Sequence, residues 1–239
     1  MTTSADATEV LLFDVFGTVV DWRTSLRQWF QRFGRENNFQ ADWAGVVDDW
    51  RAAYEPAMAR VRQGERPYVT LDVLHRESLD ALLPRYGVEN VLESDRRQMA
   101  RAWRWLDPWP DTVAGLTRLK RKYVIGTLSN GGLGLLVDMA KYAGLPWDTI
   151  LSADLFKRYK PDAAVYLGAA ELLARPTSAL MLVAAHNYDL AAARSHGYRT
   201  AFVARPTEYG PRQKKDFGPE DAWDFSAGSL EELAEKMGA

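Results

Sequence analysis

The chain of 239 residues contains no cysteine, which excludes disulfide bonds and thiolate chemistry. An excess of charge is also lacking: 30 basic and 32 acidic residues leave a formal net charge of −2, so nothing points to nucleic acid or an anionic membrane as partner. No apolar run approaches membrane-spanning length, and residues 1–8 lack the basic and apolar segments of a secretory signal. With an ordinary apolar content of 47%, the sequence predicts a globular cytoplasmic protein.

Short apolar runs alternate with helical patterns along most of the chain. Apolar runs that end at a turn signal predict buried strands at 10–13, 123–128, 180–185 and 200–203, with weaker candidates at 148–152 and 223–225. Helical spacing and capping residues predict helices at 133–142, 161–173, 190–196 and 229–237. Strands that alternate with helices predict an α/β fold with a doubly wound parallel sheet and right-handed crossovers.

One long segment breaks this alternation. Residues 21–105 are helical in pattern, rich in arginine and tryptophan, and contain no convincing buried strand. We therefore expect a core domain made of residues 1–20 and 106–239, with residues 21–105 forming a helical insert after the first strand.

Polar clusters follow several of the predicted strands. In an open α/β sheet, ligands bind beyond the carboxyl ends of the strands. The polar residues expected at that edge are Asp14 to Thr18, Ser129 and Asn130, Lys160, and His186 to Asp189. Phe16 stands where many enzymes with this loop carry a second aspartate, so the site is expected to offer one carboxylate nucleophile without a proton donor beside it.

These motifs, in this order and spacing, resemble those of the haloacid dehalogenase superfamily over residues 10 to about 205. The matching segments are Asp14-x-x-Gly17-Thr18, Leu128-Ser129-Asn130-Gly131, Lys160-Pro161-Asp162 and the late Asp189. The type II, or L-2-haloacid, branch is the most similar, on the segments Phe13 to Thr18 and Tyr159 to Asp162 and on Tyr166. The resemblance implies a Rossmann-like core with an inserted α-helical cap, a homodimer, and metal-independent hydrolysis of a carbon–halogen bond. It implies a small halogenated carboxylate and water as partners, and no cofactor beyond a halide product.

The late motif departs from the pattern of the superfamily phosphatases and from that of the type II branch. Superfamily phosphatases hold Mg²⁺ with the first aspartate, a backbone carbonyl and late acidic residues. Of the late acidic residues only Asp189 remains here, and a site with two carboxylates and a lysine would bind Mg²⁺ poorly, so phosphoryl transfer is disfavoured. Where type II members have Ser-Ser-Asn-x-Trp-Asp, this chain has Ala184-Ala185-His186-Asn187-Tyr188-Asp189. Water positioning and halide contact are therefore expected to be organised differently, with His186 as the candidate.

The implied chemistry is nucleophilic catalysis in two steps. Asp14 attacks the halogen-bearing carbon of a short 2-haloalkanoate such as haloacetate or L-2-halopropionate, and water then hydrolyses the aspartyl ester to a 2-hydroxy acid. Lys160 is expected to keep Asp14 ionised. Thr18 and Ser129 would orient Asp14 or hold the substrate carboxylate, although such residues at strand ends are as often caps.

The remaining candidates have two interpretations each. Asp189 would orient water or pair with Lys160, or else cap the helix that begins near Leu190. His186 and Tyr166 would belong to the site, or be structural residues. The last group would bind substrate or halide, or be ordinary core and surface residues: Asn130, the insert arginine Arg51, and the aromatic residues Phe16, Trp50, Tyr68 and Tyr188.

Two other functions remain open. One is a superfamily phosphatase that acts on a small phosphate ester, and the other is a non-catalytic binding module that keeps the fold. The sequence does not fix the halogen, the chain length, the enantiomer or an oligomeric interface.

Overall fold

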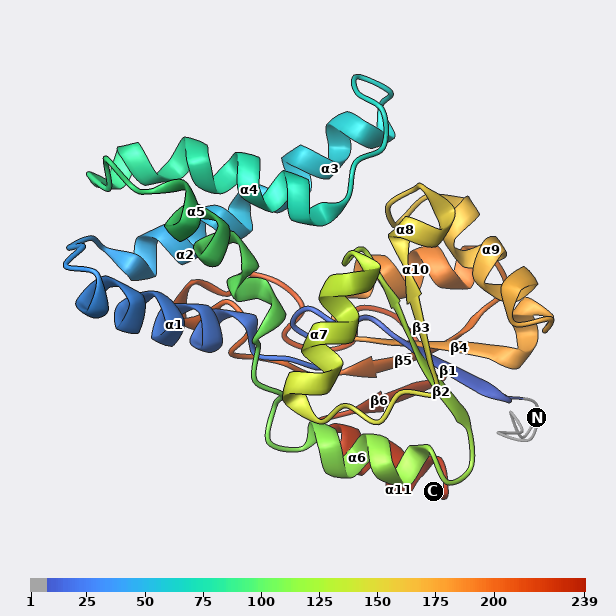
Figure 1. Ribbon diagram of the computed structural model, residues 1–239. Coiled ribbons are helices and arrows are strands. Elements are labelled where there is room, and N and C mark those ends of the chain that lie inside the picture. The colour runs from blue at the N-terminus through green and yellow to red at the C-terminus, as the bar shows by residue number, and fades with distance from the viewer. Residues whose placement is uncertain (1–7) are drawn as a thin grey trace.

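The computed structural model describes residues 8–239, apart from the side chain of Arg212. Its centre is a six-stranded sheet in which every strand is parallel to its neighbours, in the order β3-β2-β1-β4-β5-β6 (Figure 1). The strands are β1 (Val10–Phe13), β2 (Val124–Ser129), β3 (Thr149–Ser152), β4 (Leu180–Ala184), β5 (Arg199–Val203) and β6 (Phe225–Ala227). The predicted α/β fold is confirmed. The weak candidate 148–152 forms the edge strand β3, whereas the other edge strand, β6, shares only Phe225 with the candidate 223–225.

The first strand lies in the middle of the sheet. All four residues of β1 are buried, and the strand pairs with β2 on one side and with β4 on the other. Phe13 is aligned with Thr127 and Val183, so the three strands end at nearly the same level. This register brings the polar residues that follow β1, β2 and β4 to one edge of the sheet.

Alternate residues of β1 face two different cores, as a strand with helices on both faces requires. Leu11 and Phe13 pack in the core that includes side chains of α6, α7 and α11, whereas Val10 and Leu12 pack in the core that includes side chains of α9 and α10. The helices on these faces are α6 (Thr112–Leu119), α7 (Leu133–Ala143), α8 (Ala153–Phe156), α9 (Ala163–Leu172), α10 (Asn187–Ser195) and α11 (Leu230–Lys236). Two short 3-10 helices, η4 (Thr177–Ala179) and η5 (Gly210–Arg212), lie in the connections before β4 and after β5.

Helices also fill the chain between β1 and α6, and Figure 1 shows them gathered on the side toward which the strands run. They are α1 (Trp22–Glu36), α2 (Trp43–Ala52), α3 (Tyr54–Arg62), α4 (Leu71–Leu82), η2 (Leu83–Tyr86), α5 (Glu93–Ala100) and η3 (Arg101–Arg104). We call this part the helical segment. Its tryptophans are mostly buried, and its apolar side chains are continuous with the core on the Phe13 face of the sheet. The tryptophan-rich composition therefore builds a packed core.

Two helix starts differ from the sequence expectation. Helix α9 is capped by Asp162, whose side chain accepts a hydrogen bond from the backbone N–H of Ala164, so Pro161 precedes the helix instead of opening its first turn. Helix α10 begins at Asn187, three residues before the predicted start. The reason is non-local: Asp216, from the connection between β5 and β6, accepts hydrogen bonds from the backbone and side-chain nitrogens of Asn187. His186 therefore holds the cap position and Asp189 lies in the first turn.

No helix within residues 8–239 combines the length and the apolar character needed to cross a membrane. The segment in which the sequence predicts no secretory signal lies outside the described residues, except for Thr8.

Candidate active site

Asp14 occupies the edge of the sheet directly after β1. Its backbone N–H donates to the carbonyl of Val183, which continues the ladder between β1 and β4 by one residue. Its side chain is 11% exposed, and both carboxylate oxygens accept hydrogen bonds. Oδ1 lies 3.1 Å from Nζ of Lys160, while Oδ2 lies 2.8 Å from the hydroxyl of Thr18 and 3.1 Å from Nδ1 of His186.

Burial alone would raise the pKa of Asp14, because a low-dielectric environment disfavours the charged form. The Lys160 ammonium and the hydrogen bonds from His186 and Thr18 outweigh this effect and hold the pKa of Asp14 well below its usual range. The carboxylate is therefore ionised at neutral pH and fixed in one orientation.

Lys160 connects two carboxylates in the interior. Its ammonium contacts both Asp14 and Oδ2 of Asp189, and its side chain is 2% exposed. Burial lowers the pKa of Lys160, but the two carboxylates raise it above its ordinary value, so the amine stays charged. Asp189 also accepts a 2.6 Å hydrogen bond at Oδ1 from the hydroxyl of Tyr166. Both oxygens of this fully buried residue are thus engaged, and it supports Lys160 rather than facing solvent.

His186 lies between two carboxylates. Its Nδ1 faces Asp14, and its Nε2 lies 2.9 Å from Oε2 of Glu208, a buried residue in the connection between β5 and β6. The other oxygen of Glu208 accepts a hydrogen bond from the indole N–H of Trp22. The expectation that no proton donor stands beside Asp14 is therefore wrong, because a histidine at the cap position before α10 approaches Asp14, although no acid stands at Phe16.

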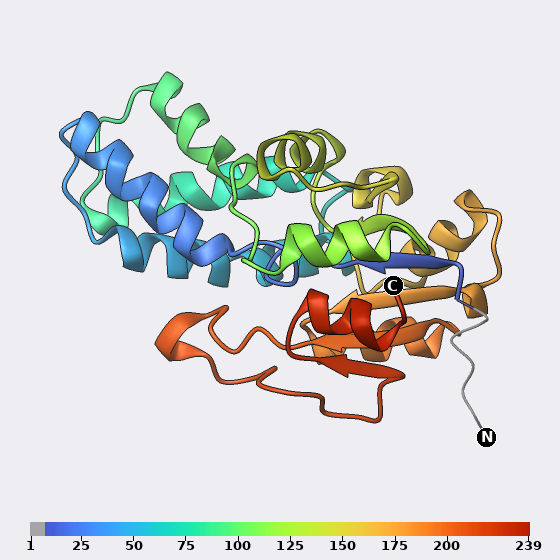
Figure 2. The same ribbon diagram turned by 90° about the horizontal axis from the view of Figure 1, so that it is seen from below.

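Sequence analysis missed Glu208 completely. Glu208 belongs to no motif and is not adjacent in the sequence to any motif residue. No local pattern therefore pointed to it. Figure 2 shows how the long β5–β6 connection, drawn in orange, runs beneath the helical segment. The hydrogen bond from Trp22 to Glu208 joins these two parts of the molecule.

The other small polar candidates hold the backbone in place. The hydroxyl oxygen of Thr18 accepts from the backbone N–H of Ala185, so its own proton is directed to Asp14. Ser129 accepts from the backbone N–H of Gly131 and so shapes the turn after β2. Asn130 accepts from the backbone N–H of Lys160 at 2.7 Å, which positions the lysine.

Arg51, at the end of α2, forms one wall of a cavity of about 500 Å³ together with Tyr54, Tyr188 and Tyr209. Its guanidinium carbon lies 4.4 Å from the ring centre of Tyr54 and 5.5 Å from that of Trp22. Among the described side chains, no carboxylate lies within ion-pair distance of Arg51, and its buried Nε lacks a hydrogen-bond partner. The cavity therefore presents a cation with unused hydrogen-bonding capacity.

Tyr54 links this cavity to the Asp14 cluster. Burial raises its pKa to about 12, and the charges of Arg51, Asp14 and Lys160 and the amide of Asn130 also act on its hydroxyl. The Tyr54 hydroxyl therefore stands among the cations and carboxylates of the site. It was not among the residues that the sequence singled out.

Of the four aromatic candidates, Tyr188 lines the cavity, whereas Phe16, Trp50 and Tyr68 do not. Phe16 packs edge-on against Trp103, with ring centres 5.6 Å apart, and half-exposed Tyr188 lines the cavity. Trp50 instead lies in the core of the helical segment, where its indole N–H donates to the carbonyl of His75, so it does not line the cavity. Tyr68 similarly donates to Asp154.

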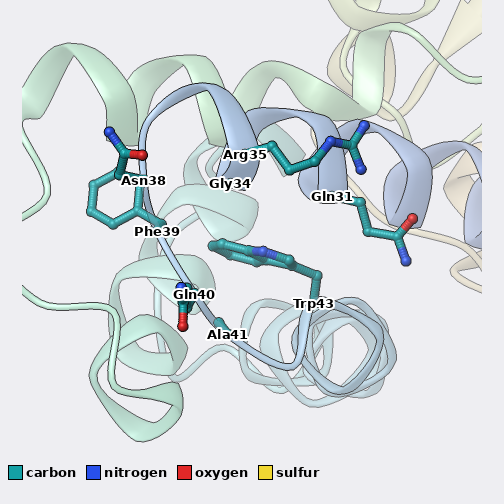
Figure 3. Close-up of a pocket in the computed structure, with 8 residues that line it drawn as sticks. All are labelled: Gln31, Gly34, Arg35, Asn38, Phe39, Gln40, Ala41 and Trp43. Carbon is teal, nitrogen blue, oxygen red and sulfur yellow. The ribbon is translucent and has the colours of Figure 1, made fainter.

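Figure 3 shows another cavity, of about 450 Å³, between the end of α1 and the start of α2. It is lined by Gln31, Gly34, Arg35, Asn38, Phe39, Gln40, Ala41 and Trp43. None of these residues belongs to the Asp14 cluster, so this cavity is separate from the site.

The parallel α/β sheet thus carries a buried, paired carboxylate, a candidate nucleophile, at the edge where doubly wound folds bind their ligands. Residues 8–197 match the family model of the haloacid dehalogenase-like hydrolases. The chain belongs to this family, in its type II or L-2-haloacid dehalogenase branch, and it is a hydrolase that acts on carbon–halide bonds.

Individual relatives support this placement. The chain is 30% identical to (S)-2-haloacid dehalogenase H-109 of Pseudomonas putida, over 90% of this chain and 97% of that protein. The structure is similar to that of the L-2-haloacid dehalogenase PA0810, with 49% identity, a TM-score of 0.94, and coverage of 97% and 99% of the two chains. It is also similar to that of the defluorinating L-2-haloacid dehalogenase Rha0230, with 45% identity, a TM-score of 0.95, and coverage of 97% and 96%.

Proposed function

We propose that the protein converts short 2-haloalkanoic acids to 2-hydroxy acids through a covalent ester on Asp14. The observation that carries this proposal is the state of Asp14: ionised, fixed by Lys160 and Thr18, and nearly removed from water. A carboxylate in that state is a competent nucleophile toward an alkyl halide once substrate excludes the remaining solvent.

In the first step an oxygen of Asp14 attacks the carbon that bears the halogen. The new carbon–oxygen bond forms as the carbon–halogen bond breaks, and the halide leaves with the bonding electron pair. The carbon is inverted, and no proton has to be supplied to the departing halide. In the second step water attacks the carboxyl carbon of Asp14, releases the hydroxy acid and restores the carboxylate.

Arg51 is our candidate for holding the anionic end of the substrate or the departing halide. Its guanidinium offers several fixed N–H donors, and the flanking Tyr54 and Trp22 rings hold it in place. The similarity to an (S)-2-haloacid dehalogenase supports a 2-haloacid of S configuration, and the similarity to the defluorinating enzyme Rha0230 extends the range to be tested to fluorinated acids.

We further propose that the reaction needs neither metal nor cofactor. The Lys160 ammonium occupies the position between Asp14 and Asp189, and within residues 8–239 no group of three acidic or histidine side chains is arranged to hold a metal ion. Halide release that is unchanged by EDTA is the expected result. Loss of halide release in EDTA with recovery on adding Mg²⁺ would contradict metal independence, and Mg²⁺-dependent release of phosphate from a small phosphate ester would favour the phosphatase alternative.

The direct test is a single turnover in ¹⁸O-water with chloroacetate or 2-chloropropionate. The label is expected in the Asp14 carboxylate first and in the hydroxy acid only after later turnovers. Asp14→Asn should abolish halide release, whereas Asp221→Asn on the surface serves as the matched control and should keep it. Label that enters the product in the first turnover would contradict the covalent intermediate.

A further inference from the structure

The two ring nitrogens of His186 each face a carboxylate oxygen, at 3.1 Å from Asp14 and 2.9 Å from Glu208. An ionised carboxylate can only accept hydrogen bonds. Both ring nitrogens must then carry a proton, which makes His186 an imidazolium in the resting enzyme. A neutral ring would leave one nitrogen lone pair directed at a carboxylate lone pair.

The alternative is that Asp14 or Glu208 carries a proton and His186 is neutral. The surroundings of both carboxyl groups disfavour their protonation. Lys160 holds Asp14 in its ionised form, as described above. Burial would raise the pKa of Glu208, but His186, Arg51 and the indole N–H of Trp22 keep it below its usual value.

The surroundings of His186 favour the cation from each side. Asp14 faces it from the end of β1, Glu208 faces it from the β5–β6 connection, and the ring of Tyr188 lies 5.8 Å away on α10. Burial would lower the pKa of His186, but the two carboxylates raise it to about 10.

The hydrogen bonds also distinguish the two oxygens of Asp14. Oδ2 accepts from both Thr18 and His186, whereas Oδ1 accepts from Lys160 alone. Each carboxylate oxygen has about two lone-pair sites, so Oδ1 keeps one for attack on carbon. Oδ2 then becomes the carbonyl oxygen of the ester, with its two donors already in place.

We propose that Oδ2 of Asp14 carries the negative charge of the ester-hydrolysis transition state, stabilised by the Thr18 hydroxyl and by a protonated His186. This inference rests on the proposed aspartyl ester and assigns His186 the role of a donor rather than that of a base. Preorganised donors aimed at a developing oxyanion are an effective source of rate acceleration.

Ester hydrolysis can be completed without His186 accepting a proton. Water adds to the carboxyl carbon, and the C=O electron pair moves onto Oδ2. On collapse that pair re-forms the C=O bond, and the bond between the carboxyl carbon and Oδ1 breaks, so that Oδ1 leaves with its bonding pair as the hydroxyl oxygen of the product and the water oxygen takes its place in Asp14. One proton of the water ends on the hydroxyl of the product. The second proton is released from the regenerated carboxyl group to solvent, because Lys160 and His186 favour its ionised form.

The first test reads the protonation state directly and does not depend on activity. The chain has three histidines, so ¹⁵N-histidine labelling followed by two-dimensional NMR gives three ring patterns, and His196→Gln and His75→Phe assign the other two. We expect the doubly protonated pattern for His186 at pH 8. In Glu208→Gln its titration should move to lower pH. A neutral ring at pH 8 in the folded wild-type protein would overturn the proposal.

The second test separates a donor from a base by following the ester in rapid-quench mass spectrometry. With a donor, the hydrolysis rate constant is level near neutral pH and falls once His186 loses its proton; with a base, it rises with pH. We expect His186→Phe and Thr18→Val each to slow ester hydrolysis about 100-fold and to accumulate the adduct. A rate that rises through the titration of His186 would overturn the donor role, whereas failure to trap any adduct would count against the proposed function itself.

Discussion

A Cβ atom on Gly17 would lie 2.1 Å from Oε1 of Glu208, so the glycine of the first motif leaves the space into which this carboxylate folds. Gly17 also has a φ of +88°, a conformation that other residues rarely adopt. The glycine thereby connects the loop after β1 with the carboxylate that faces His186.

We expect Gly17→Ala to displace Glu208, to lower kcat at least about tenfold, and to add backbone strain of about 1–2 kcal/mol. Gly87→Ala is the matched control, because Gly87 has a φ of +71° and no atom within 4 Å of its would-be Cβ. Thermal unfolding and halide release should show that Gly87→Ala loses stability but keeps its activity. Equal loss of activity in the two variants would mean that the contact with Glu208 is irrelevant.

Removing the ammonium of Lys160 should be costly, because it leaves the buried carboxylates Asp14 and Asp189 without compensation. We expect Lys160→Met to lower the free energy of unfolding by about 3–5 kcal/mol at pH 7 and to abolish halide release. Lys120→Met removes a surface ion pair with Asp148, in which both side chains are more than a third exposed, and should cost less than about 1 kcal/mol. Urea titrations of both variants make the comparison.

If Lys160→Met lowers the free energy of unfolding no more than Lys120→Met does, Asp14 and Asp189 must share a proton once the ammonium is gone. A pH series would detect this, since the destabilisation would then increase as pH rises.

The burial of His75 should make the helical segment sensitive to acid. It is buried, stacks on Trp103 with ring centres 4.5 Å apart, and neither of its ring nitrogens has a hydrogen-bond partner among the described residues. Burial, assisted by the charge of Arg51, lowers its pKa to about 3. Because the unfolded chain binds this proton more readily, the stability contribution is complete above about pH 6.5 and is lost as pH falls toward 3.

The measurement is the free energy of unfolding against pH for wild type and His75→Phe. Between pH 7 and pH 4.5 the free energy of unfolding of the wild-type protein should fall by about 3 kcal/mol more than that of the variant. The reason is that, over about two pH units below 6.5, the unfolded chain binds one proton that the folded protein does not. Parallel curves would show that His75 does not contribute.

Arg51 should act through its planar guanidinium and not through charge alone. Arg51→Lys keeps the positive charge but loses the stacking on Tyr54 and the fixed set of donors. We expect kcat/KM for 2-chloropropionate to fall about 10- to 100-fold. Arg62→Lys, at the same cavity but paired with Glu55, should change it by less than about threefold. Similar losses in both variants would assign the effect to general electrostatic attraction.

Local patterns predicted the elements that carry the central charges. Asp14 follows a short apolar run, Lys160 precedes a predicted helix, and a parallel sheet brings such positions to one edge, where the structure places both with Thr18. The start of α10 could not be predicted, because its capping group is Asp216, far away in the sequence. Trp50 was misleading for a related reason: an aromatic residue next to Arg51 can face a cavity or a core, and only tertiary packing decides which.

Glu208 shows a further limit of prediction from one sequence. The residues around it contain no motif, and its position under Gly17 and against Trp22 depends on how a long connection crosses the end of the sheet. No periodicity or spacing encodes that path. The partner of His186 therefore became visible only in three dimensions.

The dispersal of the charged cluster along the chain has a consequence for biogenesis. Asp14 and Lys160 are separated by 146 positions in the sequence, and Asp14 and His186 by 172. A nascent polypeptide thus carries the Asp14 carboxylate long before its cationic neighbours are synthesised. Until they arrive, that side chain is an ordinary hydrated carboxylate with low reactivity toward alkyl halides, and chemical competence comes only once the segments that hold Lys160 and His186 have been synthesised.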